Sequence, residues 1–252
     1  MFKKEVYISR RARLHEIMKS GLALFIGNVD SPMNYPANQY HFRQDSDFLY
    51  YFGLDLPGFA GLMDFDTGKD WIFGKDVDID DIIWMGPQPT VKELALGCGV
   101  VSTAPFAKLE SEIGDALSKK RKVHFLPPYR GENKMTLGAL LRENPCKMKT
   151  LASADLIKAV VSMRSIKEPV EIAEIEKAVA VAYEMHTTAM KMCKPGVKEQ
   201  EIFGAIEGIA LAHGGGTSFP IILSINGQTL HNHNHDNILK KGRMMVTDAG
   251  AE

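Results

Sequence analysis

The chain has 252 residues, and its 30 basic and 31 acidic side chains leave a net charge of −1. Nucleic acid and anionic membranes are therefore not expected as partners, because proteins that bind them through charge carry a basic excess. The apolar stretch 21–27 is far shorter than the roughly 20 residues of a membrane-spanning helix. Three widely spaced cysteines provide no disulfide framework and predict a reducing, cytoplasmic location.

Short apolar runs alternate with helical stretches over roughly the first 150 residues, which predicts an α/β domain. A helix is predicted over 9–19, a buried strand over 22–26 and a loop over 28–38, where two prolines interrupt the pattern. Further strand candidates and helical stretches follow at 71–73, 90–97, 106–118 and 123–126. The basic run 119–122 is interpreted as a helix C-terminus, where cations are favoured, rather than as a targeting signal.

The pattern changes after a helical stretch at 154–161 and a charged connector at 163–169, so a domain boundary is predicted near 160–168. A long helix is predicted from 170 to 192, with an apolar stripe at helical spacing formed by Ile172, Ile175, Val179, Tyr183, His186 and Met190. A second helix, 198–213, has an inward face of Ile202, Phe203, Ile206, Ile209 and Ala210 and ends at three glycines. Strands are predicted at 219–224 and 244–248.

Two polar patterns in the second region are candidate sites. In an extended segment, His231, His233 and His235 would project on one side, where neutral imidazoles could bind a transition metal; a solvated loop is the alternative. Asp248 ends an apolar strand just before Ala-Gly, which is a common way to present a metal-binding carboxylate. A simple turn explains that sequence equally well.

Five segments, in this order and spacing, together resemble the Xaa-Pro aminopeptidases (aminopeptidase P) of the pita-bread metallopeptidase superfamily. They are YHFRQDSDFLYYFGL at 40–54, MRSIKEPVEIAEIEKA at 163–178, the turn KPGVKE at 194–199, TLHNHNH at 229–235 and MMVTDAGAE at 244–252. The resemblance implies a creatinase-like α/β N-terminal domain, a mixed sheet with flanking helices, over 1–162. It also implies that 163–252 form the first half of an α+β pita-bread catalytic domain.

The resemblance also assigns site residues. His231 would line the substrate side, Asp248 would be the first metal ligand, and His233 and His235 receive no role. The family's further ligands, a second aspartate, a histidine and two glutamates, would follow Glu252. The chain is therefore expected to be truncated, to hold an incomplete ligand set and to be inactive alone.

For the complete protein, the resemblance implies hydrolysis of the bond between the first residue and a proline in second place. Two divalent metal ions are expected, and manganese suits oxygen-rich ligands better than copper does. Proline-containing peptides are the expected substrates, and homo-oligomers are expected to form through the N-terminal domain. Two alternatives stay open: a metal-free pita-bread module that binds peptides or proteins, and a hydrolase of the prolidase or creatinase type.

Overall fold

The computed structural model describes residues 2–252 and divides into two compact units. Unit 1 ends at Ile166, and unit 2 spans Lys167–Glu252. The division lies slightly beyond the expected boundary at 162/163, because helix α8 (Ala154–Arg164) buries Met163 in the core of unit 1. Within the described residues, no helix is both long and apolar enough to cross a bilayer.

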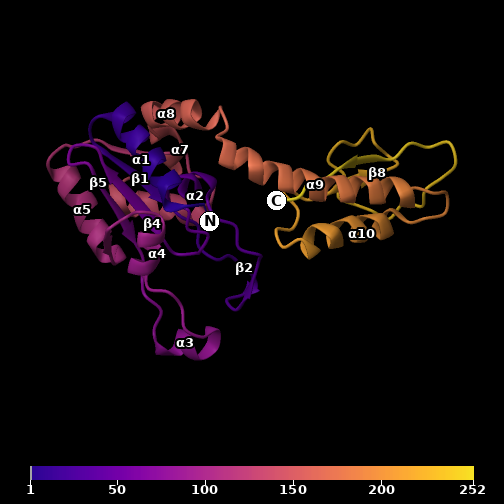
Figure 1. Ribbon diagram of the computed structural model, residues 1–252, viewed down its shortest axis with the longest axis horizontal. Helices are drawn as coiled ribbons and strands as arrows, with labels where there is room; N and C mark the ends of the chain where they lie inside the picture. The colour runs from indigo at the N-terminus through magenta and orange to yellow at the C-terminus, as the bar shows by residue number, and fades with distance from the viewer. Residues whose placement is uncertain (1) are drawn as a thin grey trace. The chain divides into compact units, whose positions relative to one another are not determined.

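Unit 1 is built on a mixed five-stranded sheet with the order β6-β5-β4-β1-β7 (Figure 1). Its strands are β1 (Leu22–Ile26), β4 (Ala60–Asp64), β5 (Lys69–Phe73), β6 (Ser102–Ala104) and β7 (Val123–Phe125). Strands β1, β4 and β5 pair antiparallel, whereas β7 and β6 add to the two sides in parallel. The sheet confirms the predicted α/β fold and the strands at 22–26, 71–73 and 123–126.

Helices cover both faces of this sheet. Successive apolar side chains of its central strands lie on opposite faces, and each face forms its own hydrophobic core. Besides α8, the helices of unit 1 are α1 (Lys4–Met18), α2 (Ser46–Phe52), α3 (Ile79–Met85), α4 (Val91–Gly97), α5 (Phe106–Ser118), α6 (Gly131–Leu141), η1 (Pro145–Lys147) and α7 (Met148–Leu151). Ala23 and Phe25 of β1 join the core under α1, α2, α4 and α8, whereas Leu22 and Leu24 join the core under α5, α6 and α7.

Two parts of unit 1 differ from the sequence expectation. Helix α1 begins at Lys4, well before the predicted start, and the predicted loop 28–38 contains the strand β2 (Pro32–Tyr35) of a small hairpin with β3 (Asn38–Gln39). In α1, Arg10 and Arg11 lie inside the protein at 2% exposure each, which polarity-based reasoning does not anticipate. Arg11 donates to Asp70 and to the carbonyls of Tyr51, Cys98 and Gly99, so its charge is well compensated.

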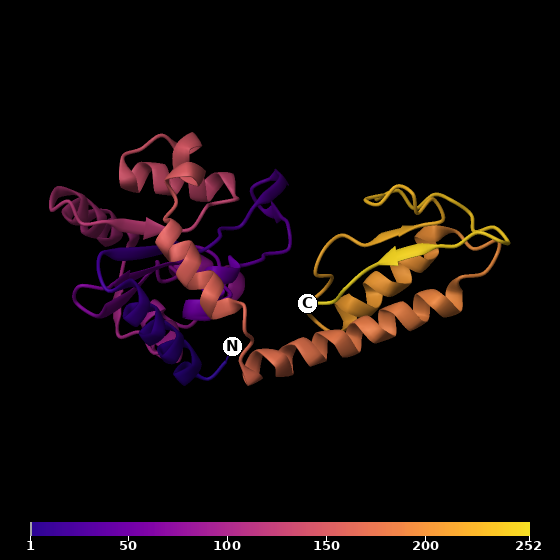
Figure 2. The ribbon, with the colours of Figure 1, turned by 90° about the horizontal axis from the view of Figure 1, so that it is seen from above.

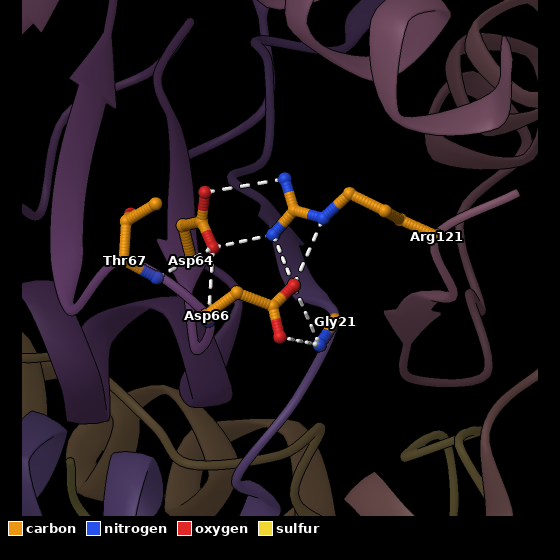
Figure 3. A network of polar contacts seen from close by, with 5 residues as sticks. All are labelled: Gly21, Asp64, Asp66, Thr67 and Arg121. Carbon is orange, nitrogen blue, oxygen red and sulfur yellow. Dashed lines mark hydrogen bonds and ion pairs between the residues drawn. The ribbon is translucent and has the colours of Figure 1, made fainter. Parts of the chain in front are cut away.

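The basic run 119–122 has a structural role at the edge of unit 1 (Figure 3). Its Arg121 bridges Asp64 and Asp66 at the β4–β5 turn, with Nε 2.9 Å from an Asp66 oxygen. Although burial opposes the effect, the Arg121 guanidinium and the Thr67 N–H lower the pKa of the Asp64 carboxyl below its ordinary value. Asp66 also accepts from the Gly21 N–H, which ties the start of β1 to the same cluster.

Unit 2 packs two helices, α9 (Pro169–Met192) and α10 (Glu199–Ala212), beside a two-stranded antiparallel ribbon (Figure 2). The ribbon pairs β8 (Ile222–Ser224) with β9 (Val246–Asp248). The predicted inward face of α10 is confirmed, since Ile202, Ile206 and Ala210 are buried and Phe203 and Ile209 pack against them. Both predicted strands also form, although each is shorter than expected.

The apolar stripe of α9 is not the face that is buried in unit 2. Met185 and Ala189 are the buried residues of this helix, and Val181 and Met192 pack beside them. The apolar members of the predicted stripe are exposed at 43–72%: Ile172, Ile175, Val179, Tyr183 and Met190. The spacing correctly predicted a helix, but apolar spacing alone could not show which of its faces α10 and the ribbon cover.

Candidate functional site

Asp248 is the last residue of β9, and its side chain is exposed. The backbone on either side of it is held by neighbours: Asp248 pairs with Ile222 in the ribbon, and His186 Nε2 on α9 donates to the Ala249 carbonyl at 2.9 Å. The Ser218 N–H then donates to the Gly250 carbonyl at 3.0 Å. A rigid strand end therefore presents the carboxylate to solvent.

Gly250 explains one position of the segment that follows Asp248. A Cβ at this residue would lie 2.7 Å from Ser218 Oγ, so any larger residue here would require the Ser218 hydroxyl to move. The pairing continues to the end of the chain, where the Glu252 N–H donates to the Gly216 carbonyl at 3.1 Å. The D-x-G-x-E pattern thus has a structural component besides its aspartate.

The three histidines lie in the histidine loop, which we define as residues 225–237 between β8 and β9. His231 and His233 are exposed, but His235 is buried at 6% exposure. The His235 ring stacks on Phe203 with centroids 4.4 Å apart, and its Nδ1 donates to the Leu223 carbonyl at 3.0 Å. The expectation that all three rings project on one side is therefore wrong, because His235 is a core residue of unit 2.

Glu199, which the sequence placed only in a turn motif, is the buried acid of this region, with 0% exposure. It is the first residue of α10, and its carboxylate accepts from the Ile225 N–H at 2.6 Å and from Asn237 Nδ2 at 3.0 Å. Its backbone N–H donates to the Asn237 carbonyl at 2.9 Å. The available signal was an acid three residues after the Pro-Gly turn, at the predicted start of a helix.

Unit 2 presents a side chain of a type that binds divalent metals, but too few such side chains are grouped together to hold an ion. A carboxylate oxygen such as that of Asp248 is a ligand that hard cations prefer. Across residues 2–252, however, no three His, Cys, Asp or Glu side chains are grouped closely enough to hold a metal ion. Asp248 is thus a single candidate ligand, and His231 lies in the exposed part of the histidine loop.

In unit 1, the segment Gln44-Asp45-Ser46-Asp47 serves the fold rather than a site. Gln44 Oε1 accepts from the N–H groups of Asn28 and Asp45, and its Nε2 donates to the carbonyls of Leu54 and Leu56. Asp45 caps α2, and burial raises the pKa of this carboxyl despite the N–H groups that donate to it. Asp47 forms an ion pair with Arg164 on α8.

Comparison with known proteins assigns both units. Residues 7–124 match the family described as Aminopeptidase P, N-terminal domain, and residues 173–252 match Metallopeptidase family M24. The two matches together cover most of the chain and relate it to the aminopeptidase P group of the M24 metallopeptidases. The candidate ligand Asp248 and the histidine loop both lie in the segment that matches the metallopeptidase family.

Curated relatives of this chain are longer than it is. The chain is 26% identical to the Xaa-Pro aminopeptidase of Escherichia coli, over 99% of this chain and 59% of that protein. A probable Xaa-Pro aminopeptidase of Chaetomium globosum is 29% identical, over 84% of this chain and 35% of that protein. The human Xaa-Pro dipeptidase is 28% identical, over 84% of this chain and 44% of that protein. The chain spans between about a third and three fifths of the length of these relatives.

Solved structures agree with this aminopeptidase P fold. The low-pH form of E. coli aminopeptidase P matches with a TM-score of 0.79 and 25% identity, over 99% of this chain and 59% of that one. A zinc-substituted E. coli aminopeptidase P in complex with product matches equally well. An N-terminal α/β domain followed by part of the catalytic domain is therefore the architecture of this chain, as the sequence predicted.

Proposed function

We propose that the whole protein is a metal-dependent Xaa-Pro aminopeptidase, which cleaves the peptide bond between the first residue and a proline in second place. The observation that carries this proposal is the match to an aminopeptidase P chain over 99% of this one, with Asp248 exposed at the end of β9. The bond before proline is a tertiary amide without an N–H, so a substrate strand cannot be recognised there by a backbone hydrogen bond.

Asp248 is proposed as a metal ligand, and Mn²⁺ is the proposed metal because carboxylate oxygens suit it. Two bound divalent ions would act as Lewis acids toward the scissile carbonyl. The contribution of Asp248 is negative charge at a fixed place, since its strand is anchored through Ile222 and Ala249. An exposed carboxylate on an anchored strand can bind a cation without rearranging the fold.

His231 is proposed to act on the substrate side. Its ring is exposed in the histidine loop and can donate a hydrogen bond to the substrate carbonyl oxygen as negative charge develops there. His233 has the same exposure but no proposed contact, and the buried His235 keeps the loop in place. Substitution of each histidine therefore has a different expected consequence.

The test is an assay of the purified whole protein with Mn²⁺ on peptides that have proline in second place. Release of the first residue, abolished by a chelator, is expected. We propose that the 252-residue chain by itself is inactive, since Asp248 alone cannot hold a metal cluster. Manganese-dependent release by that chain would refute this second proposal, and peptide binding without hydrolysis by the whole protein would favour a binding module instead.

A dipeptidase is the second candidate, because the human Xaa-Pro dipeptidase is as similar to this chain as the aminopeptidases are. The two activities separate on substrate length. An aminopeptidase cleaves a tripeptide with proline in second place, whereas a dipeptidase prefers the Xaa-Pro dipeptide. Measurement of kcat/KM on such a matched pair distinguishes them.

We further propose that the protein is cytoplasmic and forms homo-oligomers through unit 1. Cys98, Cys146 and Cys193 are all free thiols, as a reducing compartment allows. Helix α3 lies at the tip of the excursion between β5 and α4 (Figure 1), and it exposes Ile83 at 71% and Trp84 at 87%. Light scattering should show an oligomer that Trp84→Glu weakens, and a monomeric wild-type protein would contradict the proposal.

A further inference from the structure

The histidine loop is fixed at both of its ends by one buried acid. Glu199 Oε1 accepts from the Ile225 N–H at the start of the loop, and Oε2 accepts from Asn237 Nδ2 at its end. Because a loop whose ends are held together has fewer conformations, these two bonds restrict the whole segment between them. Both bonds come from the same side chain, at the start of α10.

The charge of a buried carboxylate must be compensated by hydrogen-bond donors, and Ile225 and Asn237 supply these donors to Glu199. At 0% exposure its charge would be strongly unfavourable without hydrogen-bond donors. Hydrogen bonds to a charged acceptor are about twice as strong as neutral ones. The N-terminal end of a helix, where Glu199 lies, also favours a negative charge. The clamp is therefore strong for a contact between a side chain and a loop.

The middle of the loop has weaker support. Thr229 N–H donates to the Asn226 carbonyl at 2.9 Å, and Asn232 Nδ2 donates to Ser224 Oγ at 3.2 Å. The rings of His231 and His233 are exposed. The second end of the loop is also held by the buried His235 and by the Gln200 N–H, which donates to the His235 carbonyl at 2.9 Å, whereas the clamp is what joins this end to the start of the loop at Ile225.

We propose that Glu199 is the positioning residue of His231, and that its carboxylate sets the place of the loop by bonding Ile225 and Asn237 together. The catalytic consequence rests on the proposed function of His231, whereas the structural consequence does not. Loss of the clamp would leave the fold of unit 2 intact, because its core is formed by other residues such as Ile202 and Ile206. It would free the start of the loop at Ile225 from Asn237 and so loosen the segment that carries His231, while the Gln200 N–H still holds the His235 carbonyl.

The hydrogen-bond pattern provides a reciprocal test. Asn237→Asp places two carboxylates opposite each other at a contact of 3.0 Å in the parent chain, so the clamp should open. Adding Glu199→Gln restores a donor and an acceptor, because the new amide can accept from the Ile225 N–H and donate to the new carboxylate. Glu201→Gln is the matched control, since Glu201 is an exposed acid in the same helical turn.

The experiment is amide hydrogen exchange on the 252-residue chain and its variants. The exchange rate across residues 225–236 should rise by about tenfold in Asn237→Asp, which corresponds to about 1.4 kcal/mol, the size of one such bond. The rate should return to within about twofold of the parent rate in the double variant and stay unchanged in Glu201→Gln. The core amides of α10 should be unaffected in all variants. Unchanged loop exchange in Asn237→Asp, or no recovery in the double variant, would overturn the clamp.

Kinetics of the whole protein separate positioning from stability. Glu199→Gln combined with Asn237→Asp should keep kcat near the wild-type value, whereas Asn237→Asp alone should lower kcat about tenfold with little change in KM. In a His231→Ala background, Asn237→Asp should have no further effect on kcat, since the residue that it positions is gone. Full additivity of the two effects would overturn the positioning role. Absence of peptidase activity in the wild type would reject the proposed function and leave the exchange result to decide the clamp.

Discussion

The two units use their family motifs differently. In unit 1, the residues around Gln44 are buried or paired and hold α2 and three loop segments together. In unit 2, His231 and Asp248 are exposed at an anchored loop and an anchored strand end, and the buried residues next to them do the holding. The family motif of unit 1 therefore consists of residues that stabilise the fold. The motifs of unit 2 contain the candidate functional residues, next to residues that hold them in place.

This contrast predicts that substitutions in the unit 1 motif act on stability. Gln44→Leu leaves two N–H groups and two carbonyls without a partner, and two of the four lost bonds, to the Asn28 N–H and the Leu54 carbonyl, are fully buried. At about 1–3 kcal/mol for each of these two groups, the loss should be about 2–6 kcal/mol. Chemical denaturation of the 252-residue chain measures it. Gln88→Leu, at an exposed position, is the control and should change stability by less than about 0.5 kcal/mol. Similar stabilities for the two variants would remove the structural interpretation of the motif.

The three histidines sharpen the comparison inside unit 2. His235→Ala removes the stacking on Phe203 and a buried hydrogen bond, and should destabilise unit 2 by about 2–3 kcal/mol. His233→Ala should stay within about 0.5 kcal/mol, because its ring is exposed. Thermal unfolding of the two variants compares them directly. A larger loss from His233→Ala than from His235→Ala would reverse the assignment.

Unit 2 also shows what the sequence could predict and what it could not. The inward face of α10 was predictable because the apolar residues at helical spacing on it all belong to the core of unit 2. The α9 face was not, because Ile172 and Ile175 have the same spacing as buried residues but lie outside the core of the unit. His235 and Glu199 were hidden for a related reason: burial of a polar residue depends on partners far along the chain, here Leu223 and Asn237.

If the units are separate folding bodies, proteolysis should divide them between residues 164 and 168. Ser165, Ile166 and Lys167 are exposed between α8 and α9. Brief trypsin treatment should therefore leave a stable fragment of about 160 residues, because compact domains resist cleavage while their linkers do not. Fragment masses measured over time provide the readout. Uniform digestion with no such fragment would argue that neither unit is stable by itself.

The smallest expected effect concerns acid stability of unit 1. Because the pKa of Asp64 is lowered in the folded state, its ion pair with Arg121 stabilises the fold above the ordinary carboxyl pKa, and this contribution is lost as the pH falls through the lowered value. Asp64→Asn should therefore reduce stability at pH 7 and flatten its decline below about pH 4. Denaturation midpoints from pH 7 to pH 2 measure this, and identical pH profiles for variant and wild type would contradict it.

The roles assigned to Asp248 and His231 are tested most directly by metal analysis of the whole protein after desalting, followed by kinetics at saturating Mn²⁺. Asp248→Asn should lose bound metal along with activity, because it removes a ligand charge. His231→Ala should keep its metal and lower kcat/KM by roughly 10²–10³, the usual loss for one hydrogen-bond donor to a developing oxyanion. Loss of metal from His231→Ala, or retained metal and near-normal rates in Asp248→Asn, would contradict the roles assigned to these two residues.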